Sequence, residues 1–520
     1  MSRFTSIAFQ PSVLFLLMPL AVHSAKILLL SAPIYSHCLE VSSVGQELAN
    51  RGHNVSMLLG SNFNHKNCFR KNSDGNKIIH PIIIKSKPNL KTIEQASLDM
   101  STLMENEEFN IFKHLGKADE FTSLLCQNLL WNKEGINSLK KEKFDLAIVD
   151  GFFLSYCIYL IPHVLDLPHV SVSTTFDDWI VARPTLPSIV PGPVSKFTSD
   201  MSFWERLANA FTYLIFHLLS RYVMPLEIIN EFAPGISSQD VLHMAASSRL
   251  YLYNYDTVLG YPVPTMPNHV LVGGLATAPA KPLDKEFSKI YNQSKSDIVL
   301  VTFGSSFGLL PEKVENNLVQ ALKRLKITVV WKYLKSGEDG NIKKVSWLPQ
   351  NDLLGNSKTK LFISHCGNNG LFEALYHGVP ILCTPLFGDQ FTNAMRVQHW
   401  KVGRYTNLIM STEDDLFAAI TDIMTTPNYR ENMRKASAIF HSRPMNPRQR
   451  AAFWVEHVLK FGGGYLRSRG SDLCVLSYLG YDCLIFVLFV LFLVLCALYK
   501  SVVCCCHCCV KAKQDKIKTS

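Results

Sequence analysis

Residues 347–390 of the chain read WLPQNDLLGNSKTKLFISHCGNNGLFEALYHGVPILCTPLFGDQ. Within this stretch the apolar run 361–364 predicts a buried strand, and the sequence HCGNNG after it predicts a tight turn. The periodic residues 371–377 predict a helix, and 379–383 predict a second strand. A strand, a turn, a helix and a strand in this order are typical of a βαβ unit with parallel strands.

The alternation of strands and helices continues on both sides of this unit. The further elements that we expect are strands at 297–303 and 327–333 with a helix at 311–325, and, earlier in the chain, strands at 26–32, 54–59 and 144–150 with a helix at 40–50. Repeated βαβ units form parallel sheets that helices cover on both faces. We therefore predict an α/β protein with two doubly wound, Rossmann-like domains that face a cleft. The predicted domains are 26–275 and 286–460, with a linker around 262–282 that is rich in proline and glycine.

The two ends of the chain carry the signals of a membrane-anchored secretory protein. Arg3, the apolar stretch 13–22 and the mostly small residues after it predict a signal peptide at 1–25. Residues 483–499 carry no charge, which is close to the minimum length for crossing a hydrocarbon core of about 30 Å. We predict a transmembrane helix at 483–503. The lysines beyond it place the tail, residues 504–520, in the cytosol and the two domains in the lumen.

The tail also suggests which membrane holds the chain. Lys516 and Lys518 stand fifth and third from the end, a pattern similar to an endoplasmic-reticulum retrieval signal. We therefore expect a single-pass type I protein of that membrane. Five cysteines crowd into 504–509, where acylation is a better explanation than zinc, because contiguous cysteines lack the loop that lets ligands surround a metal. The other cysteines are scattered singly, so no disulfide framework can be read from them. Asn292 is the better of two candidate glycosylation sites, Asn54 being the other.

The composition excludes disorder and argues against nucleic acid as a partner. The chain of 520 residues is 48% hydrophobic and 18% charged. Its net charge of +10 has a contribution from the C-terminal lysines, which are Lys500, Lys511, Lys513, Lys516 and Lys518. No basic stripe with interleaved aromatic residues appears in the rest of the sequence, so we expect no nucleic-acid binding.

The turn HCGNNG is suited to binding a diphosphate. It precedes the N-terminus of the expected helix, where unpaired N–H groups and a partial positive charge stabilise phosphate. Gly367 and Gly370 let the backbone approach the ligand closely, and His365 can donate a hydrogen bond to it. Glu373 lies one helical turn after Asn369, where a carboxylate can accept bonds from ribose hydroxyls.

A second glycine turn, Gly304-Ser305-Ser306, follows the expected strand at 297–303. It is placed to meet the diphosphate from the other side, with Ser305 as a donor. One such turn is weak evidence, but two in the same half, each between a strand and a helix, are better.

These motifs together resemble the signature segment of the UDP-glycosyltransferases, which include the vertebrate UDP-glucuronosyltransferases and the plant glycosyltransferases. The residues that carry the resemblance are Trp347-Leu-Pro-Gln350-Asn-Asp-Leu-Leu354, His365-Cys-Gly-Asn-Asn-Gly370, Glu373 and Asp389-Gln390. The resemblance runs from about residue 26 to the tail. It implies a fold of the GT-B type, a UDP-sugar as co-substrate and no cofactor.

The resemblance also implies roles for the residues of the segment. Trp347 stacks on uracil, Gln350 bonds the nucleoside, and Asp389 with Gln390 holds the sugar hydroxyls. Cys366 stands where animal members usually have glycine, but plant members carry cysteine there, so we do not expect a catalytic thiol.

His37 and Asp150 both lie at the carboxyl ends of expected strands of the first half, the edge where ligands bind. By the resemblance, His37 is the general base that removes the acceptor proton, and Asp150 orients and stabilises the imidazole. The nearby helix N-terminus disfavours imidazolium, so we expect a neutral ring with a pKa of about 6.5. The expected reaction is a single inverting displacement. Because no Asp-x-Asp sequence is placed to hold a metal, we expect no metal site.

Asn254 bears on which sugar is transferred. Glucuronosyl members generally carry an arginine at this position, thought to meet the sugar carboxylate. Losing that charge-assisted bond would cost about 1.5–3 kcal/mol. Gln390, in place of histidine, resembles glucose-type more than galactose-type members. We therefore expect UDP-glucose or UDP-N-acetylglucosamine as donor, with UDP-glucuronate as the alternative.

The acceptor is expected to be a small lipophilic compound with a hydroxyl group, and its identity is not readable. The apolar segment 203–223 could line its pocket, touch the membrane surface or form an ordinary core helix. Two other classes stay open: a non-catalytic anchored protein that binds a UDP-sugar or a lipid, and a nucleotide-sugar epimerase. The presence of His37 and Asp150 argues against the first, and the membrane anchor against the second. A homo- or hetero-oligomer also stays open.

Overall fold

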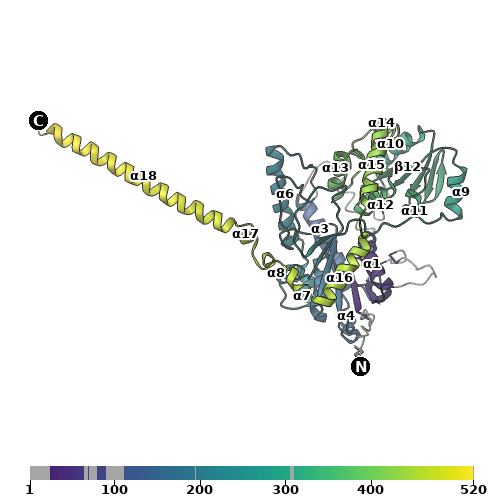
Figure 1. Ribbon diagram of the computed structural model, residues 1–520, viewed down its shortest axis with the longest axis horizontal. Coiled ribbons are helices and arrows are strands. Elements are labelled where there is room, and N and C mark those ends of the chain that lie inside the picture. The colour runs from purple at the N-terminus through teal and green to yellow at the C-terminus, as the bar shows by residue number, and fades with distance from the viewer. Residues whose placement is uncertain are drawn as a thin grey trace, which may run out of the picture.

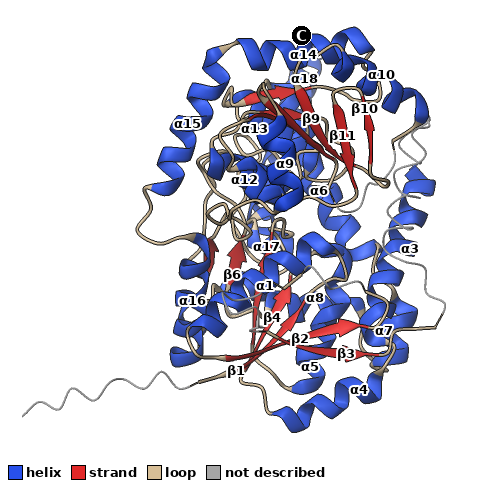
Figure 2. Cartoon of the chain, turned by 90° about the vertical axis from the view of Figure 1, so that its right-hand side faces the viewer, coloured by secondary structure: helices blue, strands red, loops and turns tan. Residues whose placement is uncertain are grey.

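The computed structural model describes residues 24–63, 68–69, 79–88, 111–193, 195–304 and 310–518. In this part of the chain two sheets of seven strands, each covered by helices, are followed by one long C-terminal helix (Figure 1). Figure 2 shows the two sheets one above the other, with helices on both sides of each. The predicted signal peptide lies outside the described residues, except for Ser24 and Ala25.

The first sheet is parallel throughout, in the order β3-β2-β1-β4-β5-β6-β7. Its strands are β1 (Lys26–Leu30), β2 (Asn54–Gly60), β3 (His80–Ile84), β4 (Leu146–Asp150), β5 (His169–Ser173), β6 (Tyr251–Tyr253) and β7 (His269–Leu271). The strand order reverses between β1 and β4. Ligands of doubly wound sheets bind at such a reversal, outside the carboxyl ends of the strands.

The second sheet repeats this plan in the order β10-β11-β9-β8-β12-β13-β14, with β10 antiparallel. Its strands are β8 (Ile298–Thr302), β9 (Thr328–Lys332), β10 (Gly337–Asp339), β11 (Ile342–Val345), β12 (Thr359–Ser364), β13 (Ile381–Cys383) and β14 (Gly403–Tyr405). Here the order reverses between β8 and β12, the strands that precede the two glycine turns.

Helices connect the strands in both halves. Those of the first half are α1 (Tyr35–Asn50), α3 (Ile111–Leu130), α4 (Lys133–Ser138), α5 (Leu160–Leu165), α6 (Phe203–Tyr222), α7 (Leu226–Phe232) and α8 (Ser238–Ala246). Those that follow are α9 (Lys285–Gln293), α10 (Glu312–Lys323), α11 (Gln350–Leu354), α12 (Asn368–His377), α13 (Gln390–His399), α14 (Glu413–Thr425), α15 (Pro427–His441), α16 (Pro447–Phe461), α17 (Val475–Tyr478) and α18 (Tyr481–Lys518).

Each sheet separates two apolar cores. In β1, Leu28 and Leu30 belong to one cluster and Ile27 and Leu29 to another. This division follows from the strand period of two, which sends successive side chains to opposite faces. All four side chains are fully buried, as expected for a parallel sheet that helices cover on both faces.

Helix α16 returns from the second half to the first. Ala451 and Val455 lie in the same apolar cluster as Ile27 and Leu29, and Arg51 of the first half pairs with Glu456 of α16 at 2.9 Å. The boundaries 26–275 and 286–460 remain predictions. The structure adds that α16, which follows the second sheet in the chain, packs on the first sheet.

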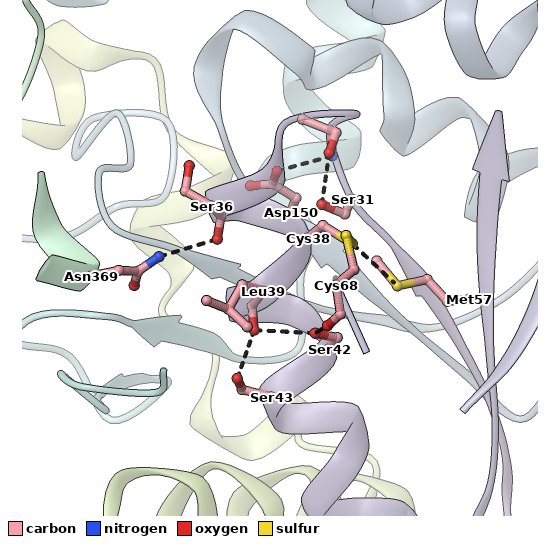
Figure 3. Close-up of a disulfide and its surroundings, with 11 residues drawn as sticks. Ser31, Ser36, Cys38, Leu39, Ser42, Ser43, Met57, Cys68, Asp150 and Asn369 are labelled. Atoms are coloured by element: carbon pink, nitrogen blue, oxygen red, sulfur yellow. Dashed lines mark hydrogen bonds between the residues drawn. A yellow bond between two sulfur atoms is a disulfide. The ribbon is translucent and has the colours of Figure 1, made fainter. Parts of the chain in front are cut away.

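Three disulfides join cysteines that the sequence presented as single. They are Cys38–Cys68 (Figure 3), Cys126–Cys157 and Cys366–Cys383, with Cα atoms 5.7, 6.0 and 5.1 Å apart. These pairings could not be read from the sequence, because the fold brings together single cysteines that are 17 to 31 residues apart. The described cysteines from Cys474 onward are free thiols.

The C-terminal helix α18 extends away from the body of the molecule (Figure 1). Its stretch Tyr481–His507 contains 27 residues and is long and apolar enough to cross a membrane. At 1.5 Å per residue such a stretch measures about 40 Å, which exceeds the hydrocarbon core. It includes the predicted span 483–503.

Candidate active site

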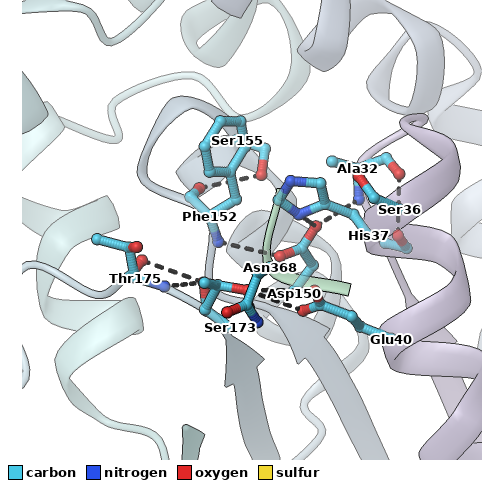
Figure 4. A network of polar contacts seen from close by, with 12 residues as sticks. Ala32, Ser36, His37, Glu40, Asp150, Phe152, Ser155, Ser173, Thr175 and Asn368 are labelled. Carbon is cyan, nitrogen blue, oxygen red and sulfur yellow. Dashed lines mark hydrogen bonds and ion pairs between the residues drawn. The ribbon is translucent and has the colours of Figure 1, made fainter. Parts of the chain in front are cut away.

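His37 and Asp150 come together at the point where the strand order of the first sheet reverses. His37 lies in the first turn of α1, just after β1, and Asp150 ends β4. Because β1 and β4 are adjacent and parallel, both side chains emerge at the same edge. His37 Nδ1 lies 3.0 Å from Asp150 Oδ2 (Figure 4). This contact leaves Nε2 as the ring nitrogen that can meet a ligand.

Asp150 is buried and fixed by backbone groups. Its Oδ2 also accepts the Ala32 N–H at 3.1 Å, and its Oδ1 accepts the Phe152 N–H at 3.1 Å. The Phe152 ring packs against His37 with the ring centroids 4.6 Å apart. A carboxylate held in this way can set the orientation of an imidazole and stabilise its charged form.

The charge of His37 differs from the expectation. Burial is the largest single effect and lowers the pKa of His37, but the surrounding carboxylates, Asp150 first, together outweigh it and raise the pKa to about 9. Glu40 and Asp389 act in the same direction. The expected neutral ring is therefore wrong at pH 7, because the surrounding carboxylates dominate over the helix N-terminus.

Glu40 is a second carboxylate beside this pair, and the sequence reasoning missed it. It lies one helical turn after His37 on α1 (Figure 4) and is buried. It accepts a hydrogen bond from Thr174 Oγ1 at 3.1 Å. Burial raises the pKa of Glu40 to about 7. The spacing His-x-x-Glu at the start of a helix is the signal that could have found it, since residues three apart share a face.

The two glycine turns of the second half meet at the corresponding reversal of the second sheet. Gly304 follows β8 and His365 follows β12, and these strands are adjacent and parallel. Lys332 of β9 donates a hydrogen bond to the Gly304 carbonyl at 2.7 Å. Ser305 lies outside the described residues, so its predicted role stays a prediction.

The glycines of these turns make room for the His365 ring. A Cβ atom on Gly367 would lie 2.5 Å from His365 Nε2, and one on Gly304 would lie 2.8 Å from it. Gly304 also has a φ of +86°, which disfavours other residues. Burial, helped by Lys332, lowers the pKa of His365 to about 4, so the ring is neutral and donates one N–H.

The N-terminus of α12 faces the space between the halves. Gly367 is its N-cap residue and contributes no capping side chain. Asn369 and Gly370 in the first turn line the cavity described below. The N–H groups of a first helical turn have no partner within the helix and carry a partial positive charge, which makes this end a site for an anion.

Trp347, Gln350 and Glu373 form the next part of the site. Gln350 Nε2 donates to Glu373 Oε2 at 2.5 Å, so the two predicted nucleoside-binding side chains lie side by side. The Trp347 ring is half exposed, and Tyr35 of the first half approaches it edge-on at 6.0 Å. Lys332 Nζ lies over the same ring, 5.6 Å from its centroid. A flat aromatic ring that is half exposed suits stacking on a base.

Asp389 and Gln390 lie at the start of α13. Asn393 Nδ2 donates to Asp389 Oδ2 at 3.0 Å, and burial raises the pKa of Asp389. The Gln390 carbonyl oxygen accepts the N–H groups of Leu386 and Phe387 at 2.8 and 3.0 Å. Only the Nε2 amino group of Gln390 therefore remains to bind a ligand.

One cavity of about 940 Å³ is lined by groups of both halves. His37 and Glu40 line it from the first half, and Trp347, Glu373 and Asp389 line it from the second. Its size lies at the upper end of the range for small-molecule sites, which suits two ligands.

A comparison with protein families matches residues 25–516 to the family described as UDP-glucoronosyl and UDP-glucosyl transferase. The chain belongs to the UDP-glycosyltransferase family. The resemblance of its signature segment to this family is thereby confirmed, and so is the assignment as an enzyme of this type.

Curated relatives of this UDP-glycosyltransferase transfer different sugars by name. The UDP-glucuronosyltransferase 2C1 of Oryctolagus cuniculus is 32% identical over 477 residues, which cover 87% of this chain and 93% of the relative. The 2-hydroxyacylsphingosine 1-beta-galactosyltransferase of Rattus norvegicus is 32% identical over 496 residues, covering 92% and 87%.

Solved glycosyltransferase structures share the fold. The UDP-glucose: anthocyanidin 3-O-glucosyltransferase in complex with UDP matches with a TM-score of 0.56 and 16% identity, over 84% of this chain and 99% of that one. The Spinosyn Forosaminyltransferase SpnP matches with a TM-score of 0.55 and 14% identity, over 84% and 100%. The predicted arrangement of two Rossmann-like domains of the GT-B type is confirmed.

Asn254 of this UDP-glycosyltransferase does not reach the cavity surface. It is fully buried, and its side-chain oxygen accepts the Gly274 N–H at 2.9 Å. Its backbone carbonyl accepts Asn368 Nδ2 at 3.0 Å, which joins the first half to the first turn of α12. An asparagine here therefore supports the wall of the site and does not meet a ligand directly.

The described residues contain no group of three or more His, Cys, Asp or Glu side chains that could hold a metal ion. The positive groups near the expected diphosphate are the α12 N-terminus and Lys332, whose pKa burial lowers. Metal-independent transfer stays a prediction.

Proposed function

We propose that this UDP-glycosyltransferase moves a neutral hexose from UDP-glucose or UDP-N-acetylglucosamine to a hydroxyl group of a small lipophilic acceptor. One observation carries the proposal. His37, whose Nδ1 lies 3.0 Å from the buried Asp150, lines the same cavity as a helix N-terminus and the side chains of Trp347 and Glu373. A base and a nucleotide-sugar site thus share one space.

The proposed reaction is a single displacement with inversion. The acceptor oxygen attacks the anomeric carbon while its proton passes to Nε2 of His37, and the bond from that carbon to the UDP oxygen breaks. Asp150 stabilises the imidazolium that forms. The negative charge that develops on UDP is stabilised by the N–H groups of α12 and by His365, so no step requires a metal.

The charges near the proposed sugar position favour a neutral donor. Glu40, Asp150 and Asp389 all act on His37 and lie on this side of the cavity. Among the cations that line the described cavity, Arg183 is paired with Asp178. Arg396 donates to Asn393 and covers the Tyr255 ring. A glucuronate carboxylate would therefore lie close to these carboxylates, which disfavours a further negative charge there.

The acceptor end of the cavity is apolar. Phe152, Phe153 and Phe216 line it near His37, with the Phe153 and Phe216 rings 4.7 Å apart. Such walls bind a lipophilic compound through buried apolar area.

We also propose that the two halves lie in the lumen of the endoplasmic reticulum. The disulfides lie in the halves, while the described cysteines of the predicted tail, Cys504 to Cys506, are free, as expected if the halves and not the tail face an oxidising compartment. The terminal lysine pair, Lys516 and Lys518, supports location in the membrane of the endoplasmic reticulum.

A donor-by-acceptor screen on membranes that contain the full chain tests the proposal. UDP-glucose, UDP-N-acetylglucosamine, UDP-galactose and UDP-glucuronate compete as donors for phenol and sterol acceptors, and acceptor-dependent UDP release is measured. We expect transfer from one of the first two. Preference for UDP-glucuronate or UDP-galactose, which the names of relatives suggest, would contradict the donor assignment. UDP binding without release under any condition would support a non-catalytic binding protein.

A further inference from the structure

Helix α6 (Phe203–Tyr222) presents an apolar face to the outside of the molecule. From Leu207 to Leu218 every exposed residue is apolar. The large exposed side chains of the helix are Phe203, Trp204, Leu207, Phe211, Leu214, Ile215, Leu218 and Tyr222. Their spacing of three and four places most of them on one stripe that runs the length of the helix. We call this stripe the α6 face.

Two polar residues in the middle part of α6 point inward instead. Asn209 is fully buried and bonds three backbone groups, donating to Pro187 and Val190 and accepting from Gly192. His217 is buried against Asp177 at 3.0 Å. A helix on a water-exposed surface has the opposite arrangement, so the α6 face is matched to an apolar environment.

The α6 face lies on the side of the body from which the membrane anchor leaves. In Figure 1 α6 stands at the end of the body toward which α17 and α18 extend. A small cavity between them is lined by His217 and Arg221 of α6 and by 471–475, the residues that lead into α17. The C-terminal end of α6 is thus next to the segment that enters the anchor.

We propose that the α6 face docks into the surface of the same lipid bilayer that α18 crosses. Trp204 and Tyr222 stand near the two ends of the face, and such side chains are favoured where lipid meets water. The 20 residues of α6 would lie in the plane of the interface over about 30 Å.

The opposite side of α6 lines the cavity of the candidate active site. Tyr213, Phe216 and Leu219 line the cavity that contains His37. A single helix therefore separates the bilayer from the acceptor end of the site, and a compound dissolved in the membrane has a short path to it. This consequence rests on the proposed function, whereas the docking itself does not.

Site-specific photocrosslinking in a bilayer tests the docking. The full chain is placed in nanodiscs of phosphatidylcholine and phosphatidylserine, and p-benzoylphenylalanine replaces Ile215 or, as a matched control, Ile439 on α15. Both isoleucines lie on helices and are similarly exposed, at 54% and 51%. We expect at least about tenfold more lipid adduct at position 215 than at 439. Equal adduct at the two positions, or crosslinks at 215 only between protein chains, would overturn the proposal.

A second variant separates loss of docking from loss of folding. Phe211→Ser with Leu218→Ser removes apolar area from the outer face without touching the cavity lining. UDP binding, which reports the folded second half independently of transfer, should be unchanged, and lipid adduct at 215 should fall several-fold. Unchanged lipid adduct in this variant would contradict docking through the α6 face. Because neither readout requires transfer, docking can succeed or fail whatever the donor screen shows.

Discussion

At the scale of single residues, the site depends on how many carboxylates surround one imidazole. His37 is tied to Asp150 at 3.0 Å, and Glu40 follows it on the same face of α1. The carboxylates stabilise the protonated ring more than burial destabilises it, so the pKa of His37 rises to about 9. A general base must be neutral to act, which has a direct consequence for the pH dependence of transfer.

The rate of transfer should rise with pH across the neutral range. Below a pKa of about 9 only the fraction of neutral His37 can accept the acceptor proton, so kcat/KM should increase about tenfold per pH unit and level off near that value. Initial rates at subsaturating acceptor from pH 6 to pH 10, in the stable range of the enzyme, measure this limb. A flat profile between pH 7 and 9 would mean that His37 is already neutral.

Glu40→Gln should move the rise of kcat/KM with pH to lower pH. Removing a negative charge beside His37 destabilises the imidazolium, so the pKa of His37 falls and more enzyme is active at pH 7. The amide keeps an oxygen that can accept the Thr174 hydrogen bond. An unshifted limb with lower activity at every pH would show that Glu40 acts through packing alone.

Some of the site residues could be predicted from the sequence. His37, Asp150 and the residues from Trp347 to Gln390 could be named because each stands next to a predicted strand end or helix start. Glu40 and the three disulfides could not, since single cysteines such as Cys38 and Cys68 meet only through the fold. The charge of His37 was also beyond reach, because it depends on distances between side chains from different elements.

At the scale of elements, two glycine turns that lie in close contact form the proposed diphosphate site. His365 fills the space above Gly304 and Gly367, and a Cβ atom on either glycine would collide with its ring. The ring in turn stands at the N-terminus of α12. The glycines therefore set both the position of the donor His365 and the approach of the ligand.

Gly367→Ala should weaken UDP binding by about tenfold or more, equivalent to at least about 1.4 kcal/mol. The added methyl group would lie 2.5 Å from His365 and displace it from the helix N-terminus. Isothermal titration with UDP measures the effect. Gly116→Ala on α3 is the matched control, since a Cβ atom there meets nothing within 4 Å. Equal affinity of both variants would remove the proposed role of the His365 contact.

The strands were predictable to within a few residues because their apolar runs are continuous, as at 26–32 against β1 (Lys26–Leu30). Helix α6 was not, because its period does not say which face turns inward. Only the structure shows that the polar residues Asn209 and His217 are buried while Phe211 and Ile215 are exposed, which differs from an ordinary core helix.

At the scale of the whole molecule, the site exists only when the two halves are assembled. Asn368 Nδ2 reaches the Asn254 carbonyl, and Asn369 Nδ2 donates to the Ser36 carbonyl at 3.3 Å (Figure 3). Helix α16 adds a second connection through its packing on the first sheet. The sequence predicted the facing halves but not these contacts, since no local pattern encodes which turns will touch.

Asn368→Ala should destabilise this assembly. It leaves the buried Asn254 carbonyl without its side-chain donor, at a cost of about 1–3 kcal/mol in the free energy of unfolding. Thermal unfolding of the full chain in detergent should show a lower Tm than the wild type. Asn230→Ala, at an exposed position on α7, should leave Tm unchanged. Equal Tm values for the two variants would mean that the contact between the halves adds no stability.

The most direct test of the proposed catalytic site is His37→Ala, assayed for both transfer and UDP binding on the full chain. His37 touches the acceptor side of the cavity, while the nucleotide groups lie on the other half. The proposed mechanism therefore predicts that transfer is abolished and that the Kd for UDP stays within about twofold of the wild type. Transfer that survives within about tenfold of the wild-type rate would contradict the assignment of His37 as the base.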